Sequence, residues 1–407
     1  MTERKGPGKG PLAGVKVIEL AHIMAGPTCG LMLADMGADV IKVEKIPGGD
    51  DSRYFLPPDI DGEAASFMMM NRNKRGIAVD LKQEAGKAVL KRLLKTADAL
   101  IENYRADTMD KLGVGYDALA QENPGLIYCA ISGFGRTGPY ADQGGFDLIA
   151  QGMSGLMSIT GEGEGRPPVK MGAPITDITA GILGAMAISA AYAHKLKTGE
   201  GQQIDTSLFE AGIVHTYWQS AIGLATGVAP GPMGSAHPLN APYQAFKTKD
   251  GWITLGAANQ KNWLRMLDIL DAPEIADDPR FAENKDRMAH LGDLEEALNE
   301  IFAKHMTQDW LDKLKAAGVP AGPVLNVNEM HADPHTLARD MVVDVEHARL
   351  GTVKTLGLPV KFSKTPGEVA TGAPLYGQHT REVLGEYGFS DEDVEGFIAS
   401  GVVIAAD

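Results

Sequence analysis

Asp177 is a carboxylate at the start of a long run of very small residues, in the segment PITDITAG. It can serve as a helix cap, because an Asp near a helix start accepts backbone N–H bonds and meets the positive end of the helix dipole. It can also serve as a nucleophile, since the helix start would keep the group ionised at neutral pH and nearby N–H groups can hold a developing oxyanion. The pattern alone leaves both interpretations open.

The residues around Asp177 predict one helix of about five turns that ends at Lys197, before Gly199. Nine of the 20 residues from 178 to 197 are Gly, Ala or Ser. Gly inside a helix costs about 0.5–1 kcal/mol relative to Ala, so Gly181 and Gly184 indicate that another backbone packs very closely against this helix.

Other chemistry-bearing residues are less specific. Asp147, in GGFDLIAQGMSG, precedes a helical stretch and is either a cap or a second active-site carboxylate. Cys29 lies near a helix start, where a low-pKa thiolate is possible, but a small buried core residue is the favoured interpretation. The sequence has no HExxH, CxxC or HxH spacing, which argues against a metal site.

Cationic and amide side chains gather in loops of the first half of the chain. Cations at strand ends fit a phosphorylated ligand, although a solvated charged face is the alternative for each residue taken alone. The set comprises Lys45, the run 71–75, Lys82, Asn103, Arg105 and Lys111.

The elements that must position these residues alternate between strands and helices. We expect strands at 15–20, 38–44, 99–102 and 126–131, separated by helices, which predicts βαβ units and a parallel sheet. The GxGxxG fingerprint is absent after the first strand, so a dinucleotide site is not expected there. Ligands should still bind beyond the carboxyl ends of the strands.

Length and composition bound the function further. A chain of 407 residues predicts two domains, and the net charge of −15 argues against a nucleic-acid binder. The two cysteines favour a reducing compartment. The first 14 residues are expected to be a disordered arm rather than a signal peptide, and no membrane span is expected, so the predicted location is cytoplasmic.

Several blocks in order along the chain together resemble the class III CoA-transferases, the family of formyl-CoA transferase and carnitine CoA-transferase. The resemblance begins near Pro11 and reaches the C-terminal region. The blocks are GVKVIELAHIMAGP, GADVIKVE with GGDD, NRNKRGIAVDLK, ENYRADTMDKLGVGY, LIYCAISGFGRTGPY, GGFDLIAQGMSG, APITDITAG, HPLNAPYQAFKTKDGW and PLYGQHTREVL.

The resemblance implies that Asp177 is the catalytic aspartate and that coenzyme A, as acyl-CoA, is the co-substrate. The carboxylate would attack the thioester of a donor acyl-CoA and form a mixed anhydride. CoA thiolate then converts this anhydride to an aspartyl–CoA thioester, and a carboxylic acid takes over the CoA through a second anhydride. No metal ion is implied.

The resemblance also assigns binding residues by position. Lys45 would contact the CoA phosphates, the segment from Val79 to Lys82 the adenine, and Asn103, Arg105 and Lys111 the pantetheine and phosphates. Asp147 matches an acidic active-site position. Ser235, Ala236 and His237 lie where the family has a glycine-rich lid that shields the anhydride from water. Met24 stands where formyl-CoA transferase has a glutamine, which puts recognition of a small acid in doubt.

The fold implied is α/β, with a Rossmann-like parallel-sheet large domain and a smaller inserted α+β domain in an interlocked homodimer. The expected large domain is 1–200 with 331–407, the linker 201–230 and the small domain 231–330. Neither nucleic acid nor a membrane is an expected partner.

Two alternatives remain at this point. The fold also serves α-methylacyl-CoA racemases, which transfer protons at the α-carbon and carry a His immediately before the Asp of the GxD block, where this chain has Phe146. A CoA-binding protein without catalysis is the third interpretation, and the intact Asp177 block argues against it.

Overall fold

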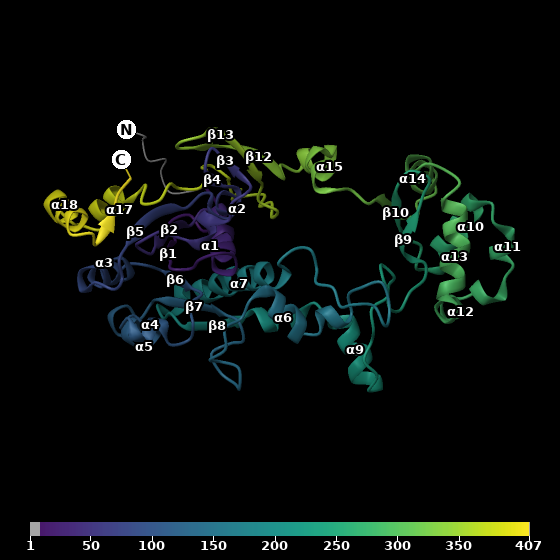
Figure 1. Ribbon diagram of the computed structural model, residues 1–407, viewed down its shortest axis with the longest axis horizontal. Helices are drawn as coiled ribbons and strands as arrows, with labels where there is room; N and C mark the ends of the chain where they lie inside the picture. Colours follow the sequence, from purple (N-terminus) through teal and green to yellow (C-terminus); the bar gives the residue numbers. More distant parts are fainter. Residues whose placement is uncertain (1–8, 407) are drawn as a thin grey trace. The chain divides into compact units, whose positions relative to one another are not determined.

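The computed structural model describes residues 9–406 and divides into two compact units (Figure 1). The first unit holds the described residues up to 155, with 171–215 and 334–406. The second holds 156–170 and 216–333. Residues 1–8, most of the expected arm, lie outside the described residues. The next residues form a turn rather than an arm, because the Leu12 N–H donates to the Met36 carbonyl at 3.0 Å.

A mainly parallel seven-stranded sheet forms the centre of the first unit, which confirms the α/β prediction. Its order is β14-β5-β2-β1-β6-β7-β8, and only β14 runs antiparallel to its neighbour. The four expected strands are confirmed as β1, β2, β6 and β7. The strand bounds are β1 Lys16–Glu19, β2 Asp39–Glu44, β5 Arg75–Val79, β6 Ala99–Glu102, β7 Ile127–Ser132, β8 Gln203–Ser207 and β14 Val403–Ile404.

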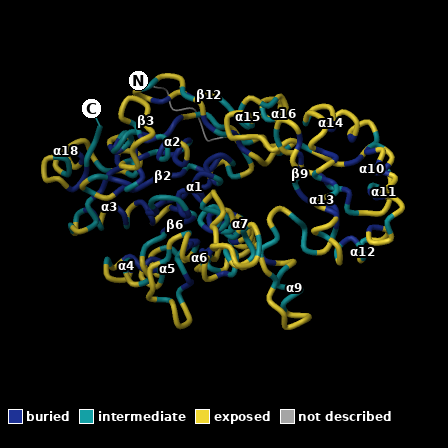
Figure 2. Tube along the Cα trace, turned by 45° about the vertical axis from the view of Figure 1, so that its right-hand side comes forward, coloured by how far each residue is buried: buried dark blue, intermediate teal, exposed yellow. Residues whose placement is uncertain are grey.

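The strands bury both of their faces, as a parallel sheet covered by helices requires. Val17 faces a core shared with α1, α7 and α8, while Ile18 faces a second core shared with α3, α17 and α18. Buried residues accordingly follow the strands and α1 in Figure 2. The helices of this unit are α1 Ala25–Asp35, α2 Ala65–Asn71, α3 Glu84–Leu94, α4 Thr108–Lys111, α5 Tyr116–Glu122, α6 Asp147–Met153, α7 Ile175–Thr198, α8 Leu208–Val214, α16 Pro334–Ala338, α17 Thr380–Glu386 and α18 Asp391–Ala399.

Helix α7 is the helix predicted around Asp177, and Gly199 ends it in the left-handed region with φ 80°. Its glycines allow the predicted close approach, here to α1. A Cβ added at Gly181 would lie 2.5 Å from the Ala25 carbonyl oxygen, and one at Gly184 would lie 3.2 Å from Cys29 Sγ. By length and composition α7 is also long and apolar enough to cross a membrane, as the core helix of a soluble protein can be. Its packing against α1 favours the core helix.

Residues 334–406, which follow the second unit in the sequence, complete the first unit. The tail forms the two short helices α17 and α18, and Ser390 and Asp393 make a capping box at the start of α18. Two short ribbons lie outside the main sheet. One pairs β3 Asp59–Ile60 with β4 Glu63–Ala64, and the other pairs β12 Val342–His347 with β13 Gly351–Leu356.

The second unit is α+β. Strands β9 and β10 pair antiparallel as a hairpin, and β11 adds a third strand. Phe246, Trp263 and Phe302 are buried in its core. The elements are α9 Tyr217–Thr226, β9 Tyr243–Lys247, β10 Trp252–Gly256, α10 Gln260–Leu270, α11 Pro273–Ala276, α12 Asn284–Ala289, α13 Leu291–Phe302, α14 Thr307–Ala316, β11 Ala321–Pro323 and α15 Val327–Ala332. Single 3₁₀ turns occur at Asp51–Tyr54 in the first unit and at Leu156–Ser158 and Pro279–Phe281 in the second.

The domain boundaries given above stay a prediction, although the units differ from them in detail. Strand β8 and helix α8 fall in the stretch expected to be a linker and belong to the first unit, because β8 pairs with β7. Residues 156–170, expected in the large domain, group with the second unit.

We predict that Gly181→Ala lowers the free energy of unfolding by about 1–2 kcal/mol, because the new Cβ meets a backbone oxygen that cannot move without shifting α1. Gly396→Ala is the matched control. It also lies inside a helix but has no atom within 4 Å of the added Cβ, so it should raise stability by about 0.5–1 kcal/mol. Urea denaturation measures both, and a Gly181→Ala protein as stable as the parent would contradict the packing argument.

Candidate active site

Asp177 lies in the first turn of α7, on the face that packs against α1. It precedes Gly181 by four residues, so both occupy the same side of the helix. Gly181 meets Ala25 and Thr28 while Gly184 meets Cys29, so α1 and α7 run in the same direction. One turn before Gly181, the Asp177 side chain therefore lies level with the loop 22–24 that leads into α1.

The carboxylate of Asp177 is half-buried and accepts no hydrogen bond from the residues that the structure describes. Burial, with the negative charge of Asp147 as a second cause, raises its pKa from 3.8 to about 7. The prediction that the helix start would keep this group fully ionised is therefore wrong. The cap interpretation of Asp177 also fails, because the residue lies inside the first turn and another carboxylate takes up the Thr176 N–H.

That other carboxylate is Asp147, the first residue of α6. Its Oδ1 accepts from the Thr176 N–H at 3.0 Å and from Thr176 Oγ1 at 2.8 Å, so it caps the start of α7 rather than its own helix. Gln151 donates to Asp147 Oδ2 at 2.7 Å and accepts from the Met171 N–H at 2.9 Å. Asp147 thus fixes the start of α7 and adds a negative charge beside Asp177.

The loop opposite Asp177 is held by Asn103. The Asn103 Oδ1 accepts from the His22 N–H at 2.9 Å, and its Nδ2 donates to the His22 carbonyl at 2.8 Å. Both polar atoms of the Asn103 amide therefore bond to the loop, so Asn103 affects the candidate active site by holding His22 in place. Met24 is the N-cap residue of α1, is partly exposed, and its carbonyl accepts from the Thr28 N–H at 2.8 Å.

The predicted CoA-binding cations follow the carboxyl ends of β2, β5 and β6, which all lie at one edge of the sheet. Lys45 pairs with Asp51 and Lys111 pairs with Asp107, while Lys82 and Arg105 are exposed. Val79 differs from this set. It is 1% exposed in the core and its backbone pairs with Val403, so its side chain is not available to an adenine. In that segment Asp80 and Leu81 are partly exposed and Lys82 is exposed.

Two further lysines lie beside Lys111 at a common cavity. A cavity of about 370 Å³ lies between α3 and α4, with Lys87, Lys91 and Lys111 among its lining residues together with Glu84 and Asp110. Lys87 and Lys91 were not predicted as ligand-binding residues from the sequence. Their spacing of four places them on one helix face, but only the tertiary structure shows that this face meets Lys111.

The predicted lid residues belong to the second unit. Ser235 Oγ accepts from the Ala245 N–H at 3.0 Å, and the His237 N–H donates to the Tyr243 carbonyl at 3.0 Å. The His237 ring makes edge contacts with the rings of Trp218 and Tyr243, at centroid distances of 5.8 and 5.3 Å. Ala236 lies between these two anchored residues. The lid role of Ser235, Ala236 and His237 stays a prediction.

Among residues 9–406, no group of three or more His, Cys, Asp or Glu side chains is arranged to hold a metal ion. Both cysteines, Cys29 and Cys129, are buried, as expected for core residues.

Comparison with known proteins now defines the class. A profile of CoA-transferase family III matches residues 12–380. A succinate–glutarate CoA-transferase of Agrobacterium fabrum is 44% identical over 93% of this chain and 96% of its own length. The human succinyl-CoA:glutarate CoA-transferase is 37% identical over 97% of this chain and 90% of its own length. A crystal structure of a CAIB/BAIF family protein from Brucella suis is 40% identical, with a TM-score of 0.84 over 93% of this chain and all of that one.

The chain belongs to CoA-transferase family III. It is an enzyme that transfers CoA between an acyl-CoA thioester and a carboxylate, and acyl-CoA is its co-substrate.

We predict that Asp177→Asn stabilises the protein at pH 8 and has little effect on stability at pH 4. The folded-state pKa of Asp177 is above its unfolded value of 3.8, so its stabilising protonated form is fully present at low pH and is lost as pH rises through about 7. Urea denaturation of both proteins between pH 4 and pH 8 measures the difference.

Asp147→Asn is the companion variant, since its Oδ1 still accepts from Thr176 but its charge is gone. In this variant the loss of stability should be complete at a pH below 7, because the folded-state pKa of Asp177 is lower, while burial keeps that pKa above 3.8. A difference between Asp177→Asn and the parent that does not change with pH would contradict the raised pKa.

Proposed function

We propose that this enzyme moves CoA from succinyl-CoA to a dicarboxylic acid of the glutarate class, with Asp177 as the nucleophile. The substrate class is supported by the names of the two CoA-transferases compared above. The assignment of Asp177 rests on one observation: a half-buried carboxylate that accepts no hydrogen bond from residues 9–406 stands at the start of α7, level with the loop 22–24. With a pKa of about 7, a large fraction is ionised at neutral pH.

The exchange runs through four acyl transfers. An Asp177 oxygen attacks the thioester carbonyl of the donor, and CoA leaves as the thiolate with formation of a mixed anhydride. The thiolate attacks the aspartyl carbonyl and releases succinate, which leaves an aspartyl–CoA thioester. The acceptor carboxylate attacks this thioester and again expels CoA thiolate. The thiolate finally attacks the acceptor's carbonyl, which gives the new acyl-CoA and restores the Asp177 carboxylate.

The chain's other residues have supporting roles in this proposal. Lys45, Lys82, Arg105 and Lys111 supply positive charge for the CoA phosphates. The cavity that Lys111 shares with Lys87 and Lys91 extends this charge. Ser235, Ala236 and His237 shield the anhydride from water, which would otherwise hydrolyse it.

Racemisation is disfavoured by one residue. A racemase needs two groups that exchange protons on opposite sides of the α-carbon. Phe146, where racemases of this fold carry His, is an apolar side chain that is 71% exposed and cannot accept a proton.

We further propose that the enzyme is an interlocked homodimer in the cytoplasm, with neither a membrane nor nucleic acid as partner. Support comes from large apolar side chains on two helices that pack against each other in the first unit. Phe146 and Leu148 lie at the start of α6, and Ile182 and Met186 lie on α7, and all four are 48–71% exposed. An apolar surface of this kind is usually covered by a partner.

Covalent trapping tests the chemistry. We predict that succinyl-CoA and hydroxylamine together convert Asp177 to its hydroxamate, which intact-protein and peptide mass spectrometry detect as a defined mass shift. The rate of labelling should rise through about pH 7, because only the ionised carboxylate attacks. Free glutarate should compete with hydroxylamine and reduce the label.

Asp177→Asn and Asp177→Ala are the controls and should take no label, while Asp147→Asn should still be labelled. Labelling that persists in Asp177→Ala, or CoA transfer without any trappable adduct, would overturn the role of Asp177. Labelling with an acetyl donor but not with succinyl-CoA would retain the mechanism and reject the substrate class.

Light scattering tests the assembly. We predict a single species of twice the 43.2 kDa of one chain at micromolar concentration. Met186→Glu should weaken it, since this side chain is 61% exposed in the single chain and a buried charge opposes association. A monomeric parent protein would refute the dimer.

A further inference from the structure

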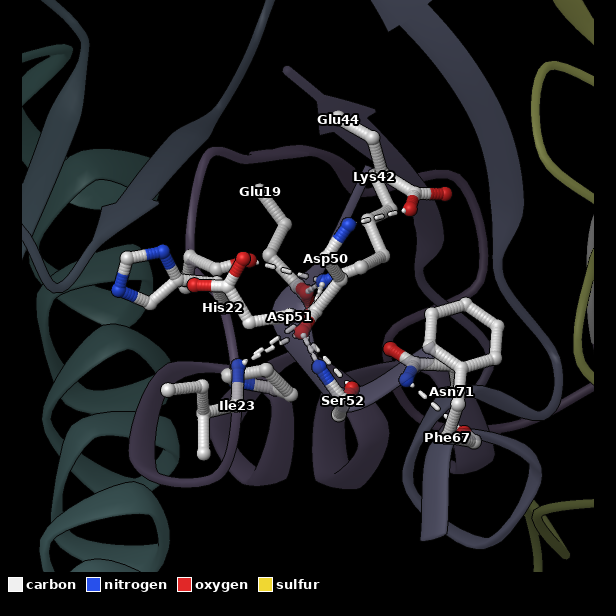
Figure 3. A network of polar contacts seen from close by, with 12 residues as sticks. Glu19, His22, Ile23, Lys42, Glu44, Asp50, Asp51, Ser52, Phe67 and Asn71 are labelled. Atoms are coloured by element: carbon white, nitrogen blue, oxygen red, sulfur yellow. Dashed lines mark hydrogen bonds and ion pairs between the residues drawn. The ribbon is translucent and has the colours of Figure 1, made fainter. Parts of the chain in front are cut away.

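The first unit contains a buried ion network at the carboxyl ends of β1 and β2 (Figure 3). Lys42 Nζ lies 3.0 Å from Glu19 Oε1 and 2.8 Å from Asp50 Oδ2, and these three side chains are at most 1% exposed. Burying ions costs several kcal/mol each, so such a network is weak evidence for stability and calls for another explanation.

The network makes direct contact with the loop opposite Asp177. Lys42 Nζ donates to the Ala21 carbonyl at 2.8 Å. The two oxygens of Asp50 accept from the Ile23 N–H at 3.0 and 3.3 Å. Asn103 holds both backbone polar groups of His22. Side chains from other segments therefore fix Ala21, just before the loop, together with His22 and Ile23.

The loop needs this support because Ile23 has a φ of 65°. A β-branched residue in the left-handed region costs about 1–3 kcal/mol, and such a conformation persists only where the surroundings hold it. Asp50 is itself fixed, since its Oδ1 also accepts from the Ser52 N–H at 2.9 Å and from Ser52 Oγ at 2.7 Å. Although burial opposes ionisation, Lys42 and these donors hold the pKa of Asp50 well below its usual range, so the carboxylate stays charged.

We propose that Asp50, held by Lys42, is a positioning residue for CoA transfer: it fixes Ile23 and thereby sets the loop 22–24 against Asp177. This inference rests on the proposed function of Asp177. The loop leads directly into α1, whose first turn meets α7 at Gly181, so a shift at Ile23 moves the surface on which the acyl group must lie. The cations proposed for the CoA phosphates are different residues, so CoA affinity does not depend on Asp50.

The test compares Asp50→Asn with Asp35→Asn. Asp50→Asn keeps the size and one acceptor oxygen but removes the charge that pairs with Lys42. We expect kcat for CoA transfer to fall about 10- to 100-fold, because a misplacement of about 1 Å can cost 100-fold in rate. We expect KM for the acyl-CoA donor to change less than about threefold.

Asp35→Asn is the matched control. Asp35 is also a buried aspartate, it pairs with Arg72 Nη2 at 2.6 Å and Asn73 Nδ2 at 2.7 Å, and it lies at the opposite end of α1 from the loop. It should lose stability by the same mechanism but keep kcat within about twofold, when both variants are assayed well below their unfolding midpoints. Urea denaturation provides the comparison of stability.

The inference is overturned if both variants lower kcat equally, or if Asp50→Asn raises KM and leaves kcat unchanged. Its failure is distinguishable from failure of the proposed function. Parent enzyme that transfers CoA and labels at Asp177, with an unaffected Asp50→Asn variant, rejects only the positioning role. Parent enzyme that transfers CoA without a label at Asp177 rejects the role of the nucleophile.

Discussion

The close packing of α7 against α1 is the constraint on which the candidate active site depends. A Cβ at Gly181 would lie 2.5 Å from a backbone oxygen of α1, so only glycine lets the two helices approach this closely. Because both helices begin at the carboxyl edge of the sheet, the approach brings their first turns together. Asp177 comes from one of them and the loop 22–24 from the other, although about 150 residues separate them in the sequence.

Two aspartates of the first unit show how pairing decides the state of a buried carboxylate. Asp50 has an ammonium group and several N–H and O–H donors, and its pKa is held well below the usual range. Asp177 has burial and a neighbouring carboxylate, and its pKa is raised to about 7. The difference follows first from burial without a cationic partner, and second from the negative charge of Asp147, which also takes the N–H of Thr176. One group is thereby fixed as a structural anion, and the other titrates near neutral pH.

The sequence predicted features that depend on local patterns. Strand 99–102 has the bounds of β6, and the glycines of α7 permit a close contact. The features that local patterns did not reveal depend on distant partners. Asp147 caps a helix that starts 28 residues later. Val79 ends in the core because β14 returns from the far end of the chain to pair with its strand.

The network around Lys42 was missed for a related reason. Lys42 lies in the middle of a strand that was recognised, and a lysine there carries no local sign of being buried. Only the sheet order, which sets β1 beside β2, brings Glu19 to it. The strain at Ile23 is equally invisible in sequence, because Ile is among the residues least expected at positive φ.

The raised pKa of Asp177 also suits the chemistry proposed for it. In this exchange the Asp177 carboxylate attacks a thioester and expels CoA thiolate. Later the Asp177 carboxylate itself leaves, when CoA thiolate attacks the acyl group that it carries. A carboxylate with an ordinary pKa near 4 leaves far more readily than a thiolate with a pKa near 8.5, so the anhydride would collapse back in favour of the thioester. A pKa of about 7 makes the carboxylate and the thiolate more similar as leaving groups. The anhydride at Asp177 is then less unfavourable relative to the thioester from which it forms.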